Sequence, residues 1–193
     1  DLHSKWVSRG ALKLIHAIDY FKLEVKDFVC LDIGASTGGF TQVLLSKNVK
    51  KIYSVDVGRN QLHEKLISNP KVINISKINA RYLDKKMITE PIDIIVCDVS
   101  FISMKKVILP NLSLLSIKKP IILGLIKPQF ECKKNELKRG GVVIDSKIHE
   151  RICNEFTNWF ESICKMKVKG ILESPIKGPK GNVEFLIYAL KET

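Results

Sequence analysis

The stretch from Phe28 to Phe40, FVCLDIGASTGGF, constrains the fold of this chain more than any other part of the sequence. An apolar run ends at Asp32, small residues and glycines follow, and a segment with helical apolar spacing comes next. This order predicts a buried strand, a tight turn and a helix. Glycines let the backbone adopt positive φ and approach a ligand closely, while the helix directs unpaired N–H groups into the same space. We therefore expect an α/β sheet with its ligand beside this first turn, outside the carboxyl ends of the strands.

The spacing of the glycines limits the classes of ligand that the turn could bind. Gly34, Gly38 and Gly39 do not form the dinucleotide fingerprint, and no Walker lysine with Ser/Thr follows, so a nucleoside without a pyrophosphate is favoured. A glycine-rich turn with a purely structural role is the alternative. The pattern D-x-G-x-x-x-G-G-F is similar to the S-adenosylmethionine motif of class I methyltransferases. The candidate cofactor-binding residues of this stretch are Asp32, Gly34, Ala35, Ser36, Gly38, Gly39 and Phe40.

Apolar periodicity predicts the remaining elements. We expect helices over 10–21, 40–48, 104–115 and 148–163, with a further helix beginning near residue 60, and later strands over 51–57, 72–76, 92–97, 120–126, 168–173 and 183–190. The last two strands are joined by a basic Gly/Pro turn too short for a crossover helix, so they should be antiparallel. The predicted fold is a Rossmann-like α/β domain with a mostly parallel seven-stranded sheet, an antiparallel last strand and helices on both faces.

Several polar side chains follow the predicted strands. Asp56 ends the second strand roughly 20 residues after the glycines, where a carboxylate reaches ribose hydroxyls in nucleoside-binding sheets. Alternatively, Asp56 caps the helix expected near residue 60. Asn79 follows the third strand and is placed to contact an adenine edge. The candidate cofactor-binding residues after the first turn are Asp56, Val57, Asn79 and Asp98.

Four charged side chains are candidates for catalysis. Asp98 and Lys127 end the fourth and fifth strands, and Glu184 begins the antiparallel strand at the same edge. Lys13 lies off the apolar stripe of the first helix, where a solvated lysine is the alternative interpretation. Two lysines and two carboxylates in one cleft should shift one another's pKa values, and a desolvated lysine can serve as the base for a hydroxyl acceptor.

The charge balance favours a polyanionic partner. The chain has 32 Lys+Arg against 20 Asp+Glu, a formal net charge of +12 and a pI near 9.5. RNA, DNA and anionic membrane all satisfy this charge. The polar loop over 131–145 is either a mobile substrate flap or a solvated insertion. The candidate RNA-binding residues are Arg9, Lys133, Lys134, Lys138, Arg139, Lys177 and Lys180.

The cysteine and hydropathy patterns bear on metal binding, on membrane insertion and on the cellular compartment. The five cysteines show no C-x-x-C spacing and the four histidines are scattered, so we expect no metal site and reduced thiols in the cytoplasm. The longest apolar run, 120–126, is too short to span a bilayer, and no signal peptide is visible. We expect no stable membrane insertion and take a monomer as the default.

The motifs together resemble those of the hemolysin A (TlyA) family of ribosomal RNA 2′-O-methyltransferases, which is related to the FtsJ type. The matching blocks run in family order over almost the whole chain and comprise 8–14, 32–41, 56–58, 79–81, 98–103, 127–131, 140–143 and 181–184. The resemblance implies S-adenosylmethionine as cofactor and ribosomal RNA or ribosomal subunits as partner. It places the family's Lys-Asp-Lys-Glu tetrad on Lys13, Asp98, Lys127 and Glu184. By the same resemblance, Lys127 is the base, Asp98 lies near the transferred methyl group, and Lys13 with Glu184 orients the nucleotide.

The resemblance also predicts the domain organisation. The family carries an N-terminal RNA-binding domain of the S4 type. Residues 1–9 are therefore expected to be a linker remnant from such a domain, and residues 10–193 the FtsJ-like methyltransferase domain.

Three alternative functions are considered. The first is N-methylation of a base. Enzymes that methylate exocyclic amines typically carry Asp/Asn-Pro-Pro-aromatic after the fourth strand, whereas this chain has Asp98-Val99-Ser100-Phe101, without prolines, which favours a hydroxyl acceptor. A membrane-active hemolysin would need an apolar span or a strongly basic amphipathic helix, and neither is visible. A catalytically silent RNA-binding module would not need Asp98 or Glu184, since phosphate binding uses cations.

Overall fold

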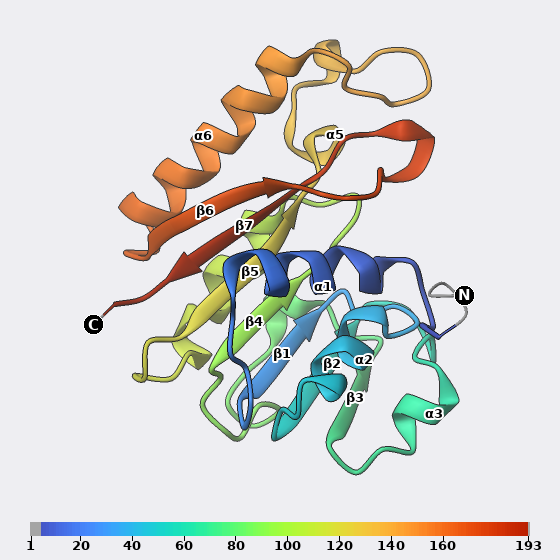
Figure 1. Ribbon diagram of the computed structural model, residues 1–193, viewed down its shortest axis with the longest axis vertical. Helices are drawn as coiled ribbons and strands as arrows, with labels where there is room; N and C mark the ends of the chain where they lie inside the picture. Colours follow the sequence, from blue (N-terminus) through green and yellow to red (C-terminus); the bar gives the residue numbers. More distant parts are fainter. Residues whose placement is uncertain (1–4, 193) are drawn as a thin grey trace.

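A computed structural model describes residues 5–192 of the chain and shows one seven-stranded sheet (Figure 1). The strands are β1 (Val29–Ile33), β2 (Lys51–Asp56), β3 (Val72–Ser76), β4 (Ile94–Cys97), β5 (Ile121–Ile126), β6 (Lys167–Glu173) and β7 (Phe185–Leu190). Their order is β3-β2-β1-β4-β5-β7-β6, and β7 alone runs in the direction opposite to the other six strands. The predicted mostly parallel sheet is confirmed. Of the predicted linker over 1–9, residues 1–4 lie outside the described residues.

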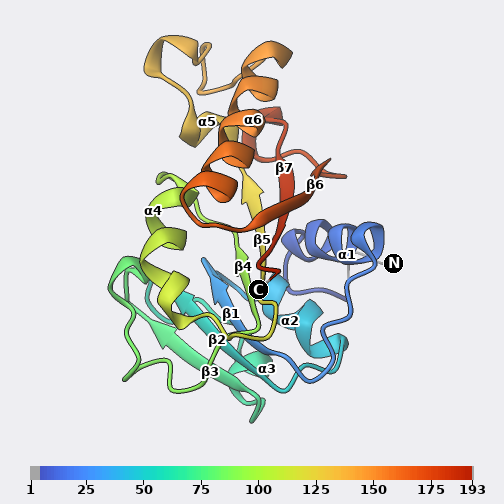
Figure 2. The same ribbon diagram turned by 90° about the vertical axis from the view of Figure 1, so that its left-hand side faces the viewer.

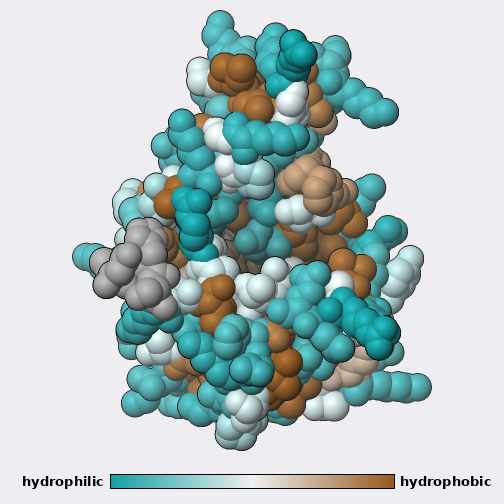
Figure 3. All heavy atoms as spheres, turned by 90° about the vertical axis from the view of Figure 1, so that its right-hand side faces the viewer, coloured by the Kyte–Doolittle hydropathy of each residue, from teal (hydrophilic) through white to brown (hydrophobic). Residues whose placement is uncertain are grey.

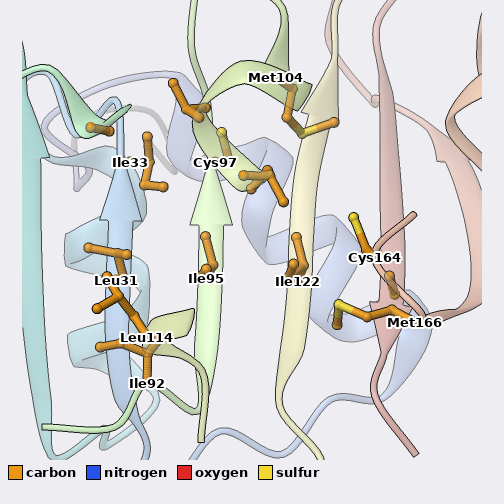
Figure 4. Packing of buried hydrophobic residues seen from close by; sticks show 14 of the residues in the cluster. Leu31, Ile33, Ile92, Ile95, Cys97, Met104, Leu114, Ile122, Cys164 and Met166 are labelled. Atoms are coloured by element: carbon orange, nitrogen blue, oxygen red, sulfur yellow. The ribbon is translucent and has the colours of Figure 1, made fainter. Parts of the chain in front are cut away.

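Helices cover both faces of the sheet (Figure 2). The helices α1 (Gly10–Phe21) and α2 (Gly39–Ser46) pack on one face, while α4 (Met104–Ile108) and α6 (Ser146–Ser162) pack on the other. Successive strand residues point to opposite faces, so β1, β2, β4, β5 and β7 contribute to both hydrophobic clusters. Figure 4 shows the α4 and α6 side, where Ile95, Cys97 and Met104 pack together. This double burial explains why β4 and β5 are continuous apolar runs.

Three predicted elements differ from the structure. The helix expected over 104–115 is α-helical only to Ile108 and continues as a 3₁₀ helix over Leu109–Leu114, because Pro110 has no N–H to donate to the preceding turn. The helix expected near residue 60 is the short α3 (Glu64–Ile67), which His63 caps. The loop expected from residue 131 follows a one-turn helix, α5 (Pro128–Glu131).

The topology brings one end of the sheet together as a functional edge. Strands β1, β2, β4 and β5 end at this edge, and β7 begins there. Figure 3 looks onto this side of the molecule, which is hollowed near its middle. Within residues 5–192, no helix is both long and apolar enough to cross a membrane, and no cluster of three metal-ligating side chains occurs.

Candidate functional site

The turn after β1 has the positive-φ geometry that its glycines predict. Gly34 has φ 81° and Gly38 has φ 106°, a backbone conformation that residues other than glycine rarely adopt. A Cβ on Gly34 would lie 2.1 Å from the carbonyl oxygen of Asp98, so glycine is required for β1 and β4 to close over this edge. The N–H groups of Gly34 and Ala35 both donate to Val55 O, at 2.9 and 3.0 Å. These bonds fix the turn against β2.

Beside this turn lies a cavity of about 410 Å³, which we call the cofactor cavity. Its walls are mainly apolar, and a few polar groups converge on it, as is usual in sites for small molecules. The residues that line it are Ile33, Gly34, Ser36, Val55, Asp56, Val57, Ile78, Asn79, Ala80, Asp98, Val99, Ser100, Phe101, Ile102 and Val107. This size and lining fit a nucleoside, because apolar walls can pack against a base and the Asp56 carboxylate can bind ribose hydroxyls.

Asp56 lines the cofactor cavity and is oriented by backbone N–H groups. Its Oδ2 accepts from Ser36 N at 2.7 Å, and its Oδ1 accepts from Gly58 N at 2.7 Å. The alternative role as a helix cap is wrong, because His63 caps α3. Each carboxylate oxygen keeps a further lone pair, so Asp56 can still accept from ribose hydroxyls.

Asn79 lines the cofactor cavity and also performs a structural task. Its Oδ1 accepts from Arg81 N at 2.9 Å and caps the 3₁₀ helix Ala80–Tyr82. The cap fixes the side chain at the cavity wall. The amide nitrogen and the second lone pair of Oδ1 are left for a contact with an adenine edge.

Two candidate residues of the first turn lie outside the cavity linings. Asp32 is fully buried, and its Oδ2 accepts from Thr41 Oγ1 at 2.7 Å, while its Oδ1 has no hydrogen-bond partner among the described residues. Burial raises the pKa of the Asp32 carboxyl to about 7, and the nearby Asp98 carboxylate adds to this rise. Gly38 packs against Leu62 and Leu66, where a Cβ would clash. Both residues therefore pack beneath the turn, in the protein interior, and do not line the cavity.

Lys127 forms the first of two ion pairs at the edge. Its Nζ lies 2.5 Å from Asp98 Oδ1 and donates to Ser100 Oγ at 2.9 Å. The Lys127 side chain is 9% exposed, whereas that of Asp98 is 24% exposed. This pair therefore opens toward the cofactor cavity, which Asp98 and Ser100 line.

Lys13 and Glu184 form the second ion pair, which is more enclosed. Lys13 Nζ donates to Glu184 Oε1 at 2.6 Å, and the Glu184 side chain is fully buried. Gln129 Nε2 makes a long contact of 3.5 Å with Glu184 Oε2. A Cβ on Gly178 would lie 2.2 Å from Glu184 Oε2, so the loop before β7 covers this carboxylate closely. The alternative of a solvated Lys13 is wrong.

Two further hollows continue from the cofactor cavity. A central hollow of about 180 Å³ shares Gly34, Ser36 and Asp98 with the cavity and is also lined by Ser8, Gly10, Lys13, Ala35, Gly39 and Phe40. A basic hollow of about 390 Å³ shares Gly10 and Lys13 with the central one and is also lined by Arg9, Ile176, Lys177, Gly178, Pro179 and Lys180. The edge therefore changes gradually from apolar walls to cationic ones.

The predicted RNA-binding residues form two groups. Three line the basic hollow next to Lys13, namely Arg9, Lys177 and Lys180. The other four, Lys133, Lys134, Lys138 and Arg139, are exposed on the loop between α5 and α6. Arg151 of α6 fixes the base of this loop, since its Nη2 donates to Glu136 Oε1 at 2.8 Å and holds the Glu136 pKa down at about 2.

Asn182 joins the loop over 131–145 to the basic segment before β7. It was not among the site residues predicted from the sequence. It is buried, its Oδ1 accepts from Val143 N at 3.0 Å, and its Nδ2 donates to Gly141 O at 3.1 Å. The tip of the loop over 131–145 is therefore tied to the segment before β7. Ser100 was also missed, although its position two residues after Asp98 was a usable signal.

Comparison with known proteins identifies relatives over nearly the whole chain. The family model for FtsJ-like methyltransferases matches residues 6–191. Hemolysin A of Brachyspira hyodysenteriae is 42% identical over 188 residues, which cover 95% of this chain and 76% of that protein. The 16S/23S rRNA (cytidine-2′-O)-methyltransferase TlyA of Mycobacterium tuberculosis is 39% identical over 193 residues, which cover 100% of this chain and 71% of that protein.

Solved structures agree with this relationship. The crystal structure of a candidate hemolysin from Lactococcus lactis superposes with a TM-score of 0.92 at 39% identity, over 97% of this chain and 89% of that one. The N-methyltransferase NodS from Bradyrhizobium japonicum has a TM-score of 0.62 at 13% identity, over 94% of this chain and 97% of that one. The second likeness concerns the fold alone.

Proposed function

The chain belongs to the FtsJ-like methyltransferase family, and we propose that it transfers a methyl group from S-adenosylmethionine to a ribose 2′-hydroxyl of ribosomal RNA in the cytoplasm. The observation that carries this proposal is the succession of hollows along one edge. Asp98 borders both the cofactor cavity and the central hollow, and Lys13 borders both the central and the basic hollow. A nucleoside cofactor and an RNA backbone can therefore meet beside the Lys127–Asp98 pair.

The cofactor cavity provides the groups that a nucleoside with a cationic tail needs. Asp56 would accept from the ribose hydroxyls, Asn79 would contact the base, and the apolar walls formed by Val57 and Val99 would pack against the rings. Asp98 lies at the junction with the central hollow, where its carboxylate can attract a sulfonium. When bound, the cofactor supplies an electrophilic methyl group whose bond to sulfur breaks with its electron pair remaining on sulfur.

Lys127 would remove the proton from the acceptor. The ribose 2′-hydroxyl passes its proton to Lys127 Nζ as the 2′-oxygen forms its bond to the methyl carbon, so the lysine ends the step as an ammonium ion. Asp98, 2.5 Å from Nζ, stabilises that charge. Lys127 is therefore suited to accept a proton at this moment.

Lys13 and Glu184 would hold the acceptor nucleotide. Glu184 fixes Lys13 at the wall between the central and basic hollows, where the ammonium faces an incoming phosphate or hydroxyl. Arg9, Lys177 and Lys180 extend this positive charge along the RNA backbone. Phosphate contacts of this kind position RNA without reading its sequence.

The test is methyl transfer with a determination of the modified atom. Ribosomal subunits are incubated with the chain and S-adenosylmethionine labelled in the methyl group, and the RNA is then hydrolysed in alkali. Hydrolysis requires a free 2′-hydroxyl, so the proposal predicts the label in alkali-resistant dinucleotides. The label should be absent with the Asp98→Ala variant. Label in single nucleotides would indicate base methylation, and no transfer by the unaltered chain would contradict the proposed function.

A further inference from the structure

Lys127 has two hydrogen-bond acceptors at the functional edge, and one of them is a serine hydroxyl. Nζ contacts Asp98 Oδ1 at 2.5 Å and Ser100 Oγ at 2.9 Å. Among the described residues, Lys13 Nζ has a hydrogen bond only to Glu184. The serine contact therefore distinguishes the proposed base from the second lysine of the site.

Stereochemistry gives this second acceptor a function. A lysine acts as a base in its neutral form, in which the tetrahedral nitrogen carries two hydrogens and one lone pair besides Cε. With Asp98 alone, rotation about the Cε–Nζ bond lets the lone pair occupy either of the two remaining staggered positions. With Asp98 and Ser100 both accepting, the two hydrogens are fixed and the lone pair takes the one position left.

We propose that Ser100 is a positioning residue that, together with Asp98, directs the lone pair of Lys127 toward the ribose 2′-hydroxyl. The inference rests on the proposed function, because it assigns Lys127 as the base. It extends that function by explaining how a flexible side chain is given one productive orientation. Orienting a reacting group before transfer is a recognised source of rate enhancement.

The backbone around Ser100 is held in place. Phe101 adopts φ 65°, a left-handed conformation that is uncommon for a bulky residue and that turns the chain sharply after Ser100. Its exposed ring packs against Phe130, with the ring centroids 4.9 Å apart. Strained conformations persist where the surroundings enforce them, and they occur often at functional sites.

A second contact joins segment 98–104, which contains Ser100, to the segment that follows Lys127. Glu131 Oε1, at the end of α5, accepts from Met104 N at 2.9 Å, and burial raises the pKa of this carboxyl. The segment 98–104 and the segment 127–131 are therefore joined both by the Phe101–Phe130 contact and by this bond. Ser100 Oγ keeps its place relative to Nζ without help from a substrate.

The experiment compares serine variants of one loop. The single-turnover rate of methyl transfer to ribosomal RNA is measured for Ser100→Ala, Ser100→Thr and, as the matched control, Ser103→Ala. KM for RNA and for the cofactor is measured for the same variants under multiple-turnover conditions. Ser103 caps α4 in the same loop through Lys105 N, so its removal tests a general loosening of the loop.

We expect Ser100→Ala to lower the rate about tenfold, the effect of one well-placed hydrogen bond, with KM for RNA and cofactor within about twofold of the original. Ser100→Thr, which keeps the hydroxyl, should restore the rate to within about threefold, and Ser103→Ala should leave it within about twofold. A Ser100→Ala variant that transfers at the original rate would overturn the proposal. Equal losses in the Ala and Thr variants, accompanied by a raised KM, would overturn it as well.

A second readout separates this inference from the proposed function. The chain is labelled with ¹³C at the lysine ε-carbons, and the Lys127 signal is assigned by its loss in Lys127→Arg. The signal should move in Ser100→Ala and stay in place in Ser103→Ala. If the unaltered chain transfers no methyl group, the proposed function fails, while the spectrum still judges the serine contact. An unmoved Lys127 signal in Ser100→Ala would show that the contact does not exist in solution.

Discussion

The two halves of the functional edge are built in different ways. The half around β1, β2 and β4 forms the cofactor cavity from apolar walls and from backbone N–H groups, such as those of Ser36 and Gly58 that hold Asp56. The half around α1, β5 and β7 is built from charges, with Lys13 paired to Glu184 and cationic loops above them. We call the first the cofactor half, which depends on chain geometry, and the second the acceptor half, which depends on charge pairs.

This difference determines how each half should respond to mutation. The turn after β1 is held by many backbone bonds, so the loss of one side chain there should weaken a ligand without unfolding the protein. The Lys13–Glu184 pair joins residues 171 positions apart in a buried setting, so the loss of either charge leaves the other without a partner. We expect cofactor affinity and acceptor handling to be separable by mutation.

The largest effect is expected for Glu184→Ala. The substitution leaves the Lys13 ammonium buried and unpaired, which typically costs about 3–5 kcal/mol of unfolding free energy. Urea denaturation measures this loss. The double variant Lys13→Met with Glu184→Leu should recover most of the stability but not methyl transfer. If Glu184→Ala were as stable as the original chain, the pair would not be the structural element of the acceptor half.

The next effect concerns Asp32 beneath the glycine turn. Burial raises its pKa to about 7 from a usual value of 3.8, so between these pH values the folded state binds a proton that the unfolded state releases. Stability from this group is therefore greatest below about pH 4 and is lost as the pH rises toward about 7, by at most about 4 kcal/mol.

Asp32→Asn should remove this part of the pH dependence. Parallel urea titrations of both proteins at several pH values measure it, because the other ionisable groups contribute equally and cancel in the difference. A difference between the two proteins that stays constant from pH 4 to 7 would show that the Asp32 carboxyl does not titrate there.

A smaller effect is expected for Asp56→Ala. The variant loses the carboxylate proposed to bind the ribose hydroxyls, so S-adenosylmethionine affinity should fall about 10- to 100-fold, or about 1.4–2.8 kcal/mol. Calorimetric titration measures this change. Asp84→Ala is the matched control, because Asp84 also accepts from nearby backbone N–H groups but does not line the cavity. Equal S-adenosylmethionine affinities for the Asp56→Ala and Asp84→Ala variants would show that the Asp56 carboxylate does not bind the cofactor.

The smallest effect is expected on the exposed basic loop. Replacing Lys133 and Lys134 by Ala should weaken RNA binding a few-fold and reduce the slope of log affinity against log salt by about one for each phosphate that the variant no longer neutralises. Replacing Lys118 and Lys119, an exposed pair just before β5, is the matched control. If both double variants behave alike, net charge rather than loop position governs binding.

The cofactor half was largely predictable from the sequence because its signals are local. The glycine turn follows directly from β1, and Asp56 follows from the end of β2. Burial could not be read from the same pattern, so Asp32, which the sequence suggests as a cofactor contact, lies beneath the turn with no exposed surface. Pro110 was visible in the sequence and should have shortened the predicted helix over 104–115.

The acceptor half was only partly predictable without the family resemblance. No local spacing connects Lys13 with Glu184, and the periodicity of the first helix suggests a solvated lysine. Strand directions gave the correct edge for Lys127, but they could not show that Ser100, two residues after Asp98, also contacts its Nζ. Contacts between distant segments have to be observed in the folded protein.

The most direct test of this account is single-turnover methyl transfer by Lys127→Ala, combined with a cofactor titration of the same variant. The account predicts a loss of about 10²- to 10⁴-fold in the transfer rate, which is the usual contribution of a general base. It also predicts S-adenosylmethionine affinity within about twofold of the original chain, because Lys127 does not line the cofactor cavity. Transfer by Lys127→Ala at the original rate would contradict the account.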